Sequence, residues 1–185
     1  MRLFAAVLPP PEAVAELARV VDPLARTGRE LRWTPHEGWH FTLAFMGDVG
    51  EHLLPELHAR LARAAERTEA FRIRLHGAGH FGGHALWIGA AGGIDTMRLL
   101  ADRADAAARR SGIPMEQHRR YTPHLTVARS RGRADMRPYT AELGAFEGAY
   151  WQVGDVHLVR SRLPVSGVPG EQPRYETVAS WPLTG

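Results

Sequence analysis

A short pattern that occurs twice constrains this chain more than any other feature. HFTLAF begins at His40 and HLTVAR begins at His124, and aligned without gaps they share His, Thr and Ala at matching positions. Apolar residues stand between the shared ones in both copies. The second histidine comes 84 positions after the first, close to half of the 185 residues. Duplication of one unit explains this spacing more simply than coincidence does.

The alternation of polar and apolar residues in both copies is typical of a half-buried strand. Successive side chains of a strand point to opposite faces of its sheet. His124, Thr126 and Ala128 are therefore expected on one face, with Leu125 and Val127 on the core face. The same rule, applied to the first copy, places His40, Thr42 and Ala44 opposite Phe41, Leu43 and Phe45.

The rest of the chain predicts groups of strands separated by helices. Strands are expected at 2–8, 32–34, 39–47, 71–77, 85–90, 121–129, 150–161 and 174–183, and helices from the prolines at 9–11 to residue 26 and at 52–67, 93–112 and 134–146. Pro23 is expected to kink or end the first helix. The order lacks a strict βαβα alternation and favours an α+β fold with largely antiparallel sheet. With the repeat, it predicts one bilobal domain over residues 1–185, whose pseudo-twofold halves face a shared cleft.

Composition excludes several classes of protein and of site. The chain has no cysteine, so it has no disulfide framework, thiolate zinc site or thiol nucleophile. All 23 basic residues are arginines, which excludes a lysine Schiff base and a P-loop lysine. No apolar run approaches the roughly 18 residues of a membrane span. The opening MRLFAAVLPP is interpreted as a buried strand rather than a secretory leader. A cytoplasmic monomer with no membrane partner is the expectation.

The charge is modest but basic, with a net charge of +3 and a pI of about 9.9. Most arginines are scattered, as solvated surface charges are. The exception is a cluster on both sides of the second motif, formed by Arg119, Arg120, Arg129, Arg131 and Arg133. This cluster could form a rim that attracts a polyanion such as RNA.

Two histidines and two threonines in one cleft suit a displacement at phosphorus. An imidazole titrates near neutral pH, so one ring can take a proton from the attacking water while the other protonates the departing oxygen. Threonine hydroxyls can donate hydrogen bonds to the phosphoryl oxygens. A strained cyclic phosphate needs no metal for this step, and no cofactor is expected.

A metal site is the next interpretation, and the sequence gives it less support. Neither motif contains a third ligand or a carboxylate. His76, His80 and His84 have a spacing that suits one face of a helix, but the glycines of HGAGHFGGH predict a loop there.

The paired motifs resemble those of the two-histidine phosphoesterase superfamily. The ordered set MRLFAAVLPP, RWTPHEGWHFTLAFMGDV, ALWIGA, RRYTPHLTVAR, SRLPVSG and RYETVASWPL is similar to its RNA 2′,3′-cyclic phosphodiesterase branch, also called 2′-5′ RNA ligases. The resemblance covers nearly the whole chain. It implies a bilobal α+β fold that needs no cofactor and opens a terminal 2′,3′-cyclic phosphate to a 2′-phosphate.

The resemblance also implies roles for individual residues. His40 resembles the general acid that protonates the departing 3′ oxygen, and His124 the base that activates water. Thr42 and Thr126 resemble the phosphate-binding threonines, and Arg129 the arginine that often closes the second motif. Alternation places Arg129 opposite His124, so it needs a bulge or the end of the strand to reach the cleft.

Two aromatic residues and the substrate leave alternatives open. Tyr121 and Phe81 could each stack on a terminal base or could simply pack. The substrate could be RNA, a small cyclic nucleotide such as one derived from ADP-ribose, or a 2′-5′-linked oligonucleotide. A non-catalytic module that binds RNA or nucleotides is the alternative from another class.

Overall fold

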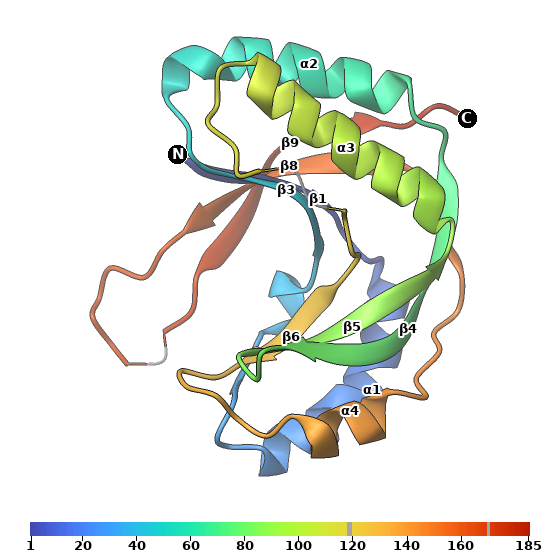
Figure 1. Ribbon diagram of the computed structural model, residues 1–185, viewed down its shortest axis with the longest axis vertical. Coiled ribbons are helices and arrows are strands. Elements are labelled where there is room, and N and C mark those ends of the chain that lie inside the picture. Colours follow the sequence, from blue (N-terminus) through green and yellow to red (C-terminus); the bar gives the residue numbers. More distant parts are fainter. Residues whose placement is uncertain (118–119, 170) are drawn as a thin grey trace.

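A computed structural model describes residues 1–117, 120–169 and 171–185 (Figure 1). The helices are α1 (Pro11–Thr27), α2 (Leu54–Glu66), α3 (Ile94–Arg110) and α4 (Arg137–Leu143), with short 3₁₀ turns η1 (His36–Gly38) and η2 (Glu51–Leu53). The strands are β1 (Arg2–Val7), β2 (Arg32–Trp33), β3 (Phe41–Asp48), β4 (Phe71–Phe81), β5 (Ala85–Gly92), β6 (Leu125–Arg129), β7 (Trp151–Val153), β8 (Asp155–Arg162) and β9 (Arg174–Pro182).

The strands form one curled sheet whose order reflects the repeat. Its main path is β7-β4-β5-β6-β3-β1-β8-β9, and β2 pairs with β6 beside it. All its ladders are antiparallel. The two motif strands β6 and β3 lie at the centre of this path and join through one residue pair, Phe41 and Leu125. The contact between β6 and β3 therefore separates two matching lobes. One lobe contains β4, β5 and β6, and the other contains β3, β1 and β8.

The helices complete the lobes by crossing between them. Helix α1 follows β1, and α3 follows β5; each helix has 17 residues and precedes a motif strand. Figure 1 shows α3 beside α2 over the lobe of β1, β3 and β8, whereas α1 lies beside α4 at the lobe of β4, β5 and β6. Each long helix thus covers the lobe opposite to that of the strand it follows. The predicted α+β fold with two pseudo-twofold lobes is confirmed.

The helices bury apolar faces with helical spacing against the sheet. In α2 the buried positions are Leu57, Leu61, Ala64 and Ala65, which recur at intervals of three or four residues. A fully buried leucine contributes roughly 1.5–3 kcal/mol relative to an exposed one. Tertiary packing of this stripe therefore stabilises α2 more than its intrinsic propensity does.

A bulge in each motif strand changes the alternation that the sequence predicts. Against β1, Ala5 and Ala6 pair with Ala44 and Thr42, so Leu43 is an extra residue in β3. Against β5, the ladder of β6 skips one residue in the same way, between Thr126 and Ala128. The five residues after each histidine have the same burial pattern: buried, intermediate, buried, buried, exposed.

The bulges correct two expectations about the faces of the motif strands. Ala44 and Ala128 were expected beside the histidines but are buried in the core. Phe45 was expected in the core but is 49% exposed. Each bulge adds one residue to its strand, so the side chains that directly follow it move to the other face.

Several predicted elements differ in extent, among them the strand expected at 121–129, which is β6, and the helix expected at 134–146, which is α4. Helix α1 continues through Pro23, where it was expected to kink or end, and runs to Thr27. The segment HGAGHFGGH is not a loop, because β4 continues to Phe81. Its chain then turns at Gly82 and Gly83, whose positive φ angles of 56° and 76° are accessible to glycine. The strand expected at 150–161 is divided at Gly154 into β7 and β8.

Within the described part of the chain, no helix combines the length and the apolar character that crossing a bilayer would require.

Candidate active site

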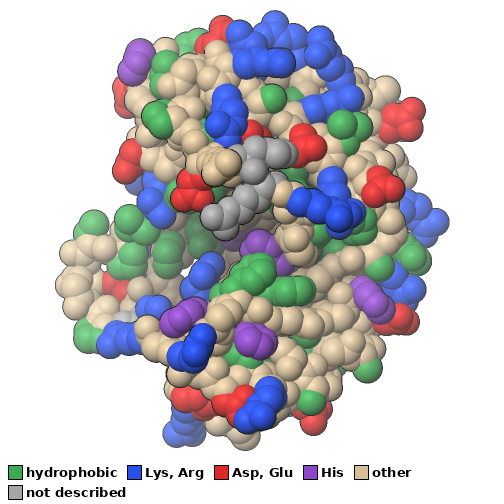
Figure 2. Space-filling model, in the orientation of Figure 1, with side chains coloured by type: hydrophobic (Ala, Val, Ile, Leu, Met, Phe, Trp, Pro, Cys, Tyr) green, Lys and Arg blue, Asp and Glu red, His purple; other side chains and the backbone are tan. Residues whose placement is uncertain are grey.

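The two motif histidines stand where the lobes meet. His40 directly precedes β3, and His124 directly precedes β6. Because Phe41 and Leu125 pair across the centre of the sheet, the residues before them enter the junction of the two lobes. Figure 2 shows histidine and arginine side chains beside a hollow in the middle of the face of the molecule drawn there.

Both imidazoles are oriented by the same kind of hydrogen bond. Nδ1 of His40 lies 2.7 Å from the carbonyl oxygen of Gly38, and Nδ1 of His124 lies 2.9 Å from that of Thr122. A carbonyl can only accept, so Nδ1 carries the proton in both rings. When such a ring is neutral, its Nε2 atom therefore presents a lone pair for proton transfer. This orientation is what an acid–base pair requires.

Thr42 extends the arrangement around His40. Its Oγ1 lies 2.9 Å from Nε2 of His40, so its hydroxyl donates to the neutral ring. Thr126 holds the corresponding place on β6 and is also partly exposed.

Aromatic rings flank each histidine. Phe4 lies 4.7 Å from the ring of His40 and Tyr175 lies 5.2 Å away, with Tyr175 edge-on. On the other lobe, Phe81 lies edge-on to His124 at 4.8 Å, and Trp87 lies 6.2 Å away. Phe4 is buried, whereas Tyr175 is 38% and Phe81 is 44% exposed. At least one partly exposed ring therefore stands beside each histidine.

The surroundings of His40 keep its ring neutral in the free protein. Burial lowers the pKa of His40, the hydrogen bond to Gly38 opposes this shift, and the nearby charges of Arg129 and His124 lower the pKa further. A bound phosphate anion would raise this pKa, because negative charge favours the imidazolium form. The protonation of His40 is thus sensitive to a ligand between the two rings.

Arg129 reaches the cleft side because of the bulge in β6. It is exposed at the end of the strand, and its charge acts on His40 across the junction. Arg131 and Arg133 follow it and line a basic pocket with Arg29 and Arg32. Arg119, which was expected on the same rim, lies outside the described residues.

Tyr121 lies apart from the two histidines. Its ring packs against the core, in a pocket with Leu43, Phe45 and Ala101 of α3. Burial raises the pKa of its phenol, and its hydroxyl has no hydrogen-bond partner among the described residues. This geometry favours packing over stacking on a base. Phe81, in contrast, keeps an exposed ring beside His124.

Those of the other histidines that the structure describes do not assemble into a metal site. In the ranges that the structure describes, no group of three or more His, Asp or Glu side chains is placed to hold an ion. His76 instead pairs with Glu147 at 3.2 Å, and His80 accepts a hydrogen bond from the backbone of Gly83.

Sequence reasoning missed the residues that orient and flank the histidines. Gly38 and Thr122 act through backbone carbonyls, which no side-chain pattern reveals. Phe4 and Tyr175 come from β1 and β9, at opposite ends of the chain. Their apolar character fits packing equally well, so only the sheet order brings them to His40.

Known proteins resemble this chain along most of its length. An RNA 2′,3′-cyclic phosphodiesterase of Aeropyrum pernix is 32% identical over 172 residues, covering 89% of this chain and 93% of the relative. One from Thermus thermophilus is 31% identical over 192 residues, covering 100% and 91%.

Solved structures agree in fold. The crystal structure of TT0787 of Thermus thermophilus has a TM-score of 0.76 and 28% identity, covering 100% of this chain and 99% of that one. E. coli LigT in its apo form has a TM-score of 0.76 at 24% identity, with 100% and 98% coverage. Residues 9–163 match the family described as the 2′-5′ RNA ligase superfamily. The chain belongs to this superfamily of two-histidine phosphoesterases.

Proposed function

We propose that this protein hydrolyses 2′,3′-cyclic phosphate ends of RNA to 2′-phosphates, as an RNA 2′,3′-cyclic phosphodiesterase. The observation that carries the proposal is the pair of histidines at the lobe junction, each with Nδ1–H bound to a carbonyl and Nε2 left for proton transfer. Relatives at 31–32% identity are named for this activity and match nearly the whole chain.

The proposed reaction is one displacement at phosphorus. Nε2 of His124 takes a proton from a water molecule, whose oxygen attacks the phosphorus atom. The bond between phosphorus and the 3′ oxygen breaks, and the Nε2–H of protonated His40 gives its proton to that oxygen. The product carries a free 3′-hydroxyl and a 2′-phosphate.

Three further side chains stabilise the charge that develops on the phosphoryl oxygens. The hydroxyls of Thr42 and Thr126 donate hydrogen bonds to them, and the guanidinium of Arg129 supplies positive charge. The hydroxyl of Thr42 bonds His40 in the free protein, so it turns from the ring to the phosphate when substrate binds.

Two further expectations, on the oligomeric state and on the location in the cell, are also proposals. The protein acts as a closed monomer whose duplicated domain spans residues 1–185, and it acts in the cytoplasm. Light scattering tests the first, and fractionation of source cells tests the second.

The deciding experiment incubates wild type, in EDTA, with an oligonucleotide that ends in a 2′,3′-cyclic phosphate. We expect a 2′-phosphate product, identified by ³¹P NMR and by its resistance to enzymes that require a 3′-phosphate. A 3′-phosphate product would contradict the assigned direction of bond cleavage. Binding without turnover on RNA ends, cyclic mononucleotides and 2′-5′-linked oligonucleotides alike would favour the non-catalytic alternative.

A further inference from the structure

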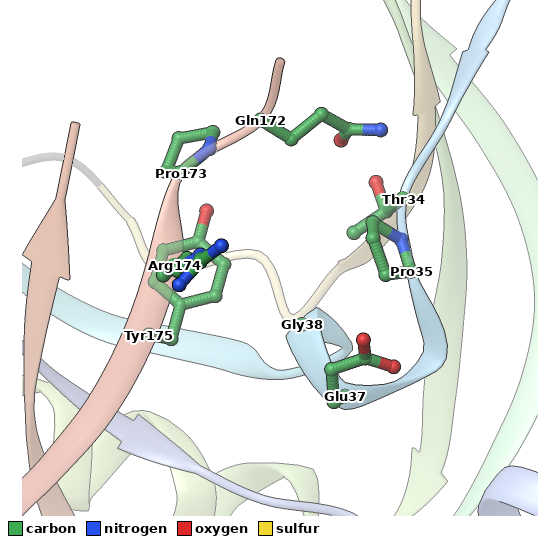
Figure 3. Close-up of a pocket in the computed structure, with 8 residues that line it drawn as sticks. All are labelled: Thr34, Pro35, Glu37, Gly38, Gln172, Pro173, Arg174 and Tyr175. Carbon is green, nitrogen blue, oxygen red and sulfur yellow. The ribbon is translucent and has the colours of Figure 1, made fainter. Parts of the chain in front are cut away.

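Two pockets lie along residues 29–38, the stretch of chain that leads to His40. The first has a volume of about 630 Å³ and lies between the segment Thr34–Gly38 and the residues that lead into β9 (Figure 3). The second has a volume of about 490 Å³ and lies between residues 29–32 and residues 130–134, with Pro169 at its edge. The chain passes from the second pocket to the first through Trp33.

A hydrogen bond marks the boundary between the two pockets. Nε2 of Gln172 donates to the carbonyl oxygen of Trp33 at 2.8 Å and joins the β8–β9 connection to β2. Thr34 is held in turn, because its amide donates to the carbonyl oxygen of Val127. Residues 29–38 therefore supply one wall of both pockets, whereas the β8–β9 connection helps to form the second wall of the first pocket and reaches the second pocket only at Pro169.

The first pocket adjoins a smaller cavity that His40 lines. This cavity shares Glu37, Gly38 and Tyr175 with it. Gly38 makes this continuity possible, since a Cβ there would lie only 3.3 Å from the ring of Tyr175. The partly exposed ring of Tyr175 offers a stacking surface, and the exposed carboxylate of Glu37 can accept a hydrogen bond from a base amino group.

The chemistry of the reaction places the terminal nucleoside on this side. The attacking water and the departing oxygen lie roughly in line on opposite sides of phosphorus. The departing 3′ oxygen belongs to the ribose of the last nucleotide, so its nucleoside lies on the side of the general acid. With His40 as the acid, that side holds the 630 Å³ pocket.

The second pocket suits the phosphates that precede this nucleoside. It is lined by Arg29, Arg32, Arg131 and Arg133, and all four side chains are exposed. Its one acidic side chain, Glu30, already accepts a hydrogen bond from the hydroxyl of Tyr139. Four guanidinium groups around one hollow can bind a chain of phosphodiesters.

We propose that the two pockets form one track for the 3′ end of an RNA strand, with the terminal nucleoside in the first and the preceding phosphates in the second. The inference rests on the proposed function and adds the path of the substrate to it. Such a track would distinguish RNA ends, which can occupy both pockets, from cyclic mononucleotides, which can occupy only the first.

The test compares a nucleoside 2′,3′-cyclic monophosphate with a tetranucleotide that ends in the same group. In Arg32→Ala/Arg131→Ala we expect KM for the tetranucleotide to rise about tenfold, while kcat/KM for the mononucleotide stays within twofold. The salt dependence of tetranucleotide binding becomes shallower by about 1.4 in log–log slope, about 0.7 for each phosphate that an arginine no longer neutralises. Affinity for a tetranucleotide ending in a 2′-phosphate needs no turnover and gives the same comparison.

The matched control is Arg63→Ala/Arg67→Ala, which removes two exposed arginines from the region of α2. It changes the net charge equally and leaves the tetranucleotide KM unchanged. Equal effects of the two double variants, or equal effects on the two substrates, would overturn the track. Wild-type turnover of the mononucleotide tests the proposed function separately.

The place of the nucleoside has its own readout. Titration with cytidine 2′-phosphate should shift the NMR signals of Thr34 and Tyr175 and leave the ring of Phe81 unchanged. Shifts centred on Phe81 and Trp87 would place the nucleoside beside His124 and overturn the assignment of the first pocket.

Discussion

The hydroxyl of Thr42 gives the sharpest test of how the site works, because it can be removed without changing the shape of the side chain. In Thr42→Val a methyl group replaces Oγ1, which lies 2.9 Å from Nε2 of His40. In the free protein one hydrogen bond is removed, which costs about 1 kcal/mol of folding free energy. In the reaction a donor to the phosphoryl oxygens is removed, and removing one such donor lowers kcat about 10²–10³-fold.

These two magnitudes can be separated by measurement. The loss in stability corresponds to a shift of about 2–4 °C in Tm for a chain of this size, read by circular dichroism. The loss in kcat is read with a cyclic mononucleotide well below that temperature. Thr126→Val should lower kcat comparably, and Thr42→Ser should restore most of the rate. A Thr42→Val enzyme with kcat within threefold of wild type would refute the role of the hydroxyl.

Four further outcomes follow from the charges and the core. Arg129→Ala removes a positive charge that lowers the pKa of His40, so the pKa of His40 measured by NMR should rise. Arg129→Lys keeps the charge and should leave this pKa near its wild-type value. With His40 as the acid, the alkaline limb of kcat/KM should lie below pH 6.5 in wild type and move upward in Arg129→Ala; an unmoved limb would contradict this coupling. The pKa of His40 is lower in the folded state than its unfolded value near 6.5. The contribution of His40 to the free energy of unfolding is therefore complete above pH 6.5 and is lost as pH falls through the folded pKa. In urea titrations, His40→Asn should lack this loss of stability at low pH. Leu86 is fully buried in β5, so Leu86→Ala should cost about 2–5 kcal/mol in urea denaturation, and a cost below 1 kcal/mol would contradict its place in the core.

Much of the fold followed from local patterns in the sequence. The duplicated motif predicted two matching lobes, and helices were expected at 52–67 and 93–112, where α2 and α3 form. Family resemblance is confirmed by relatives that match along nearly the whole chain. The paired histidines were expected at one junction, and the β3–β6 pairing brings the starts of their strands together.

The remainder depends on contacts between distant parts of the chain. A bulge is a property of two paired strands, so the alternation within one strand could not predict the place of Arg129. Tyr175 reaches His40 only because β9 follows β8 across the sheet from β1. The carbonyl of Gly38 orients His40 through the backbone, which side-chain identity does not report.

The central claim is that His40 and His124 act as one acid–base pair, and a double-mutant comparison of kcat tests it most directly. Each single alanine variant should lose about 10²–10⁴ in kcat on a cyclic mononucleotide in EDTA. Groups that act as a unit are not additive, so His40→Ala/His124→Ala should be little slower than the slower single variant. Near wild-type turnover in either single variant, or losses that simply multiply in the double variant, would contradict the account.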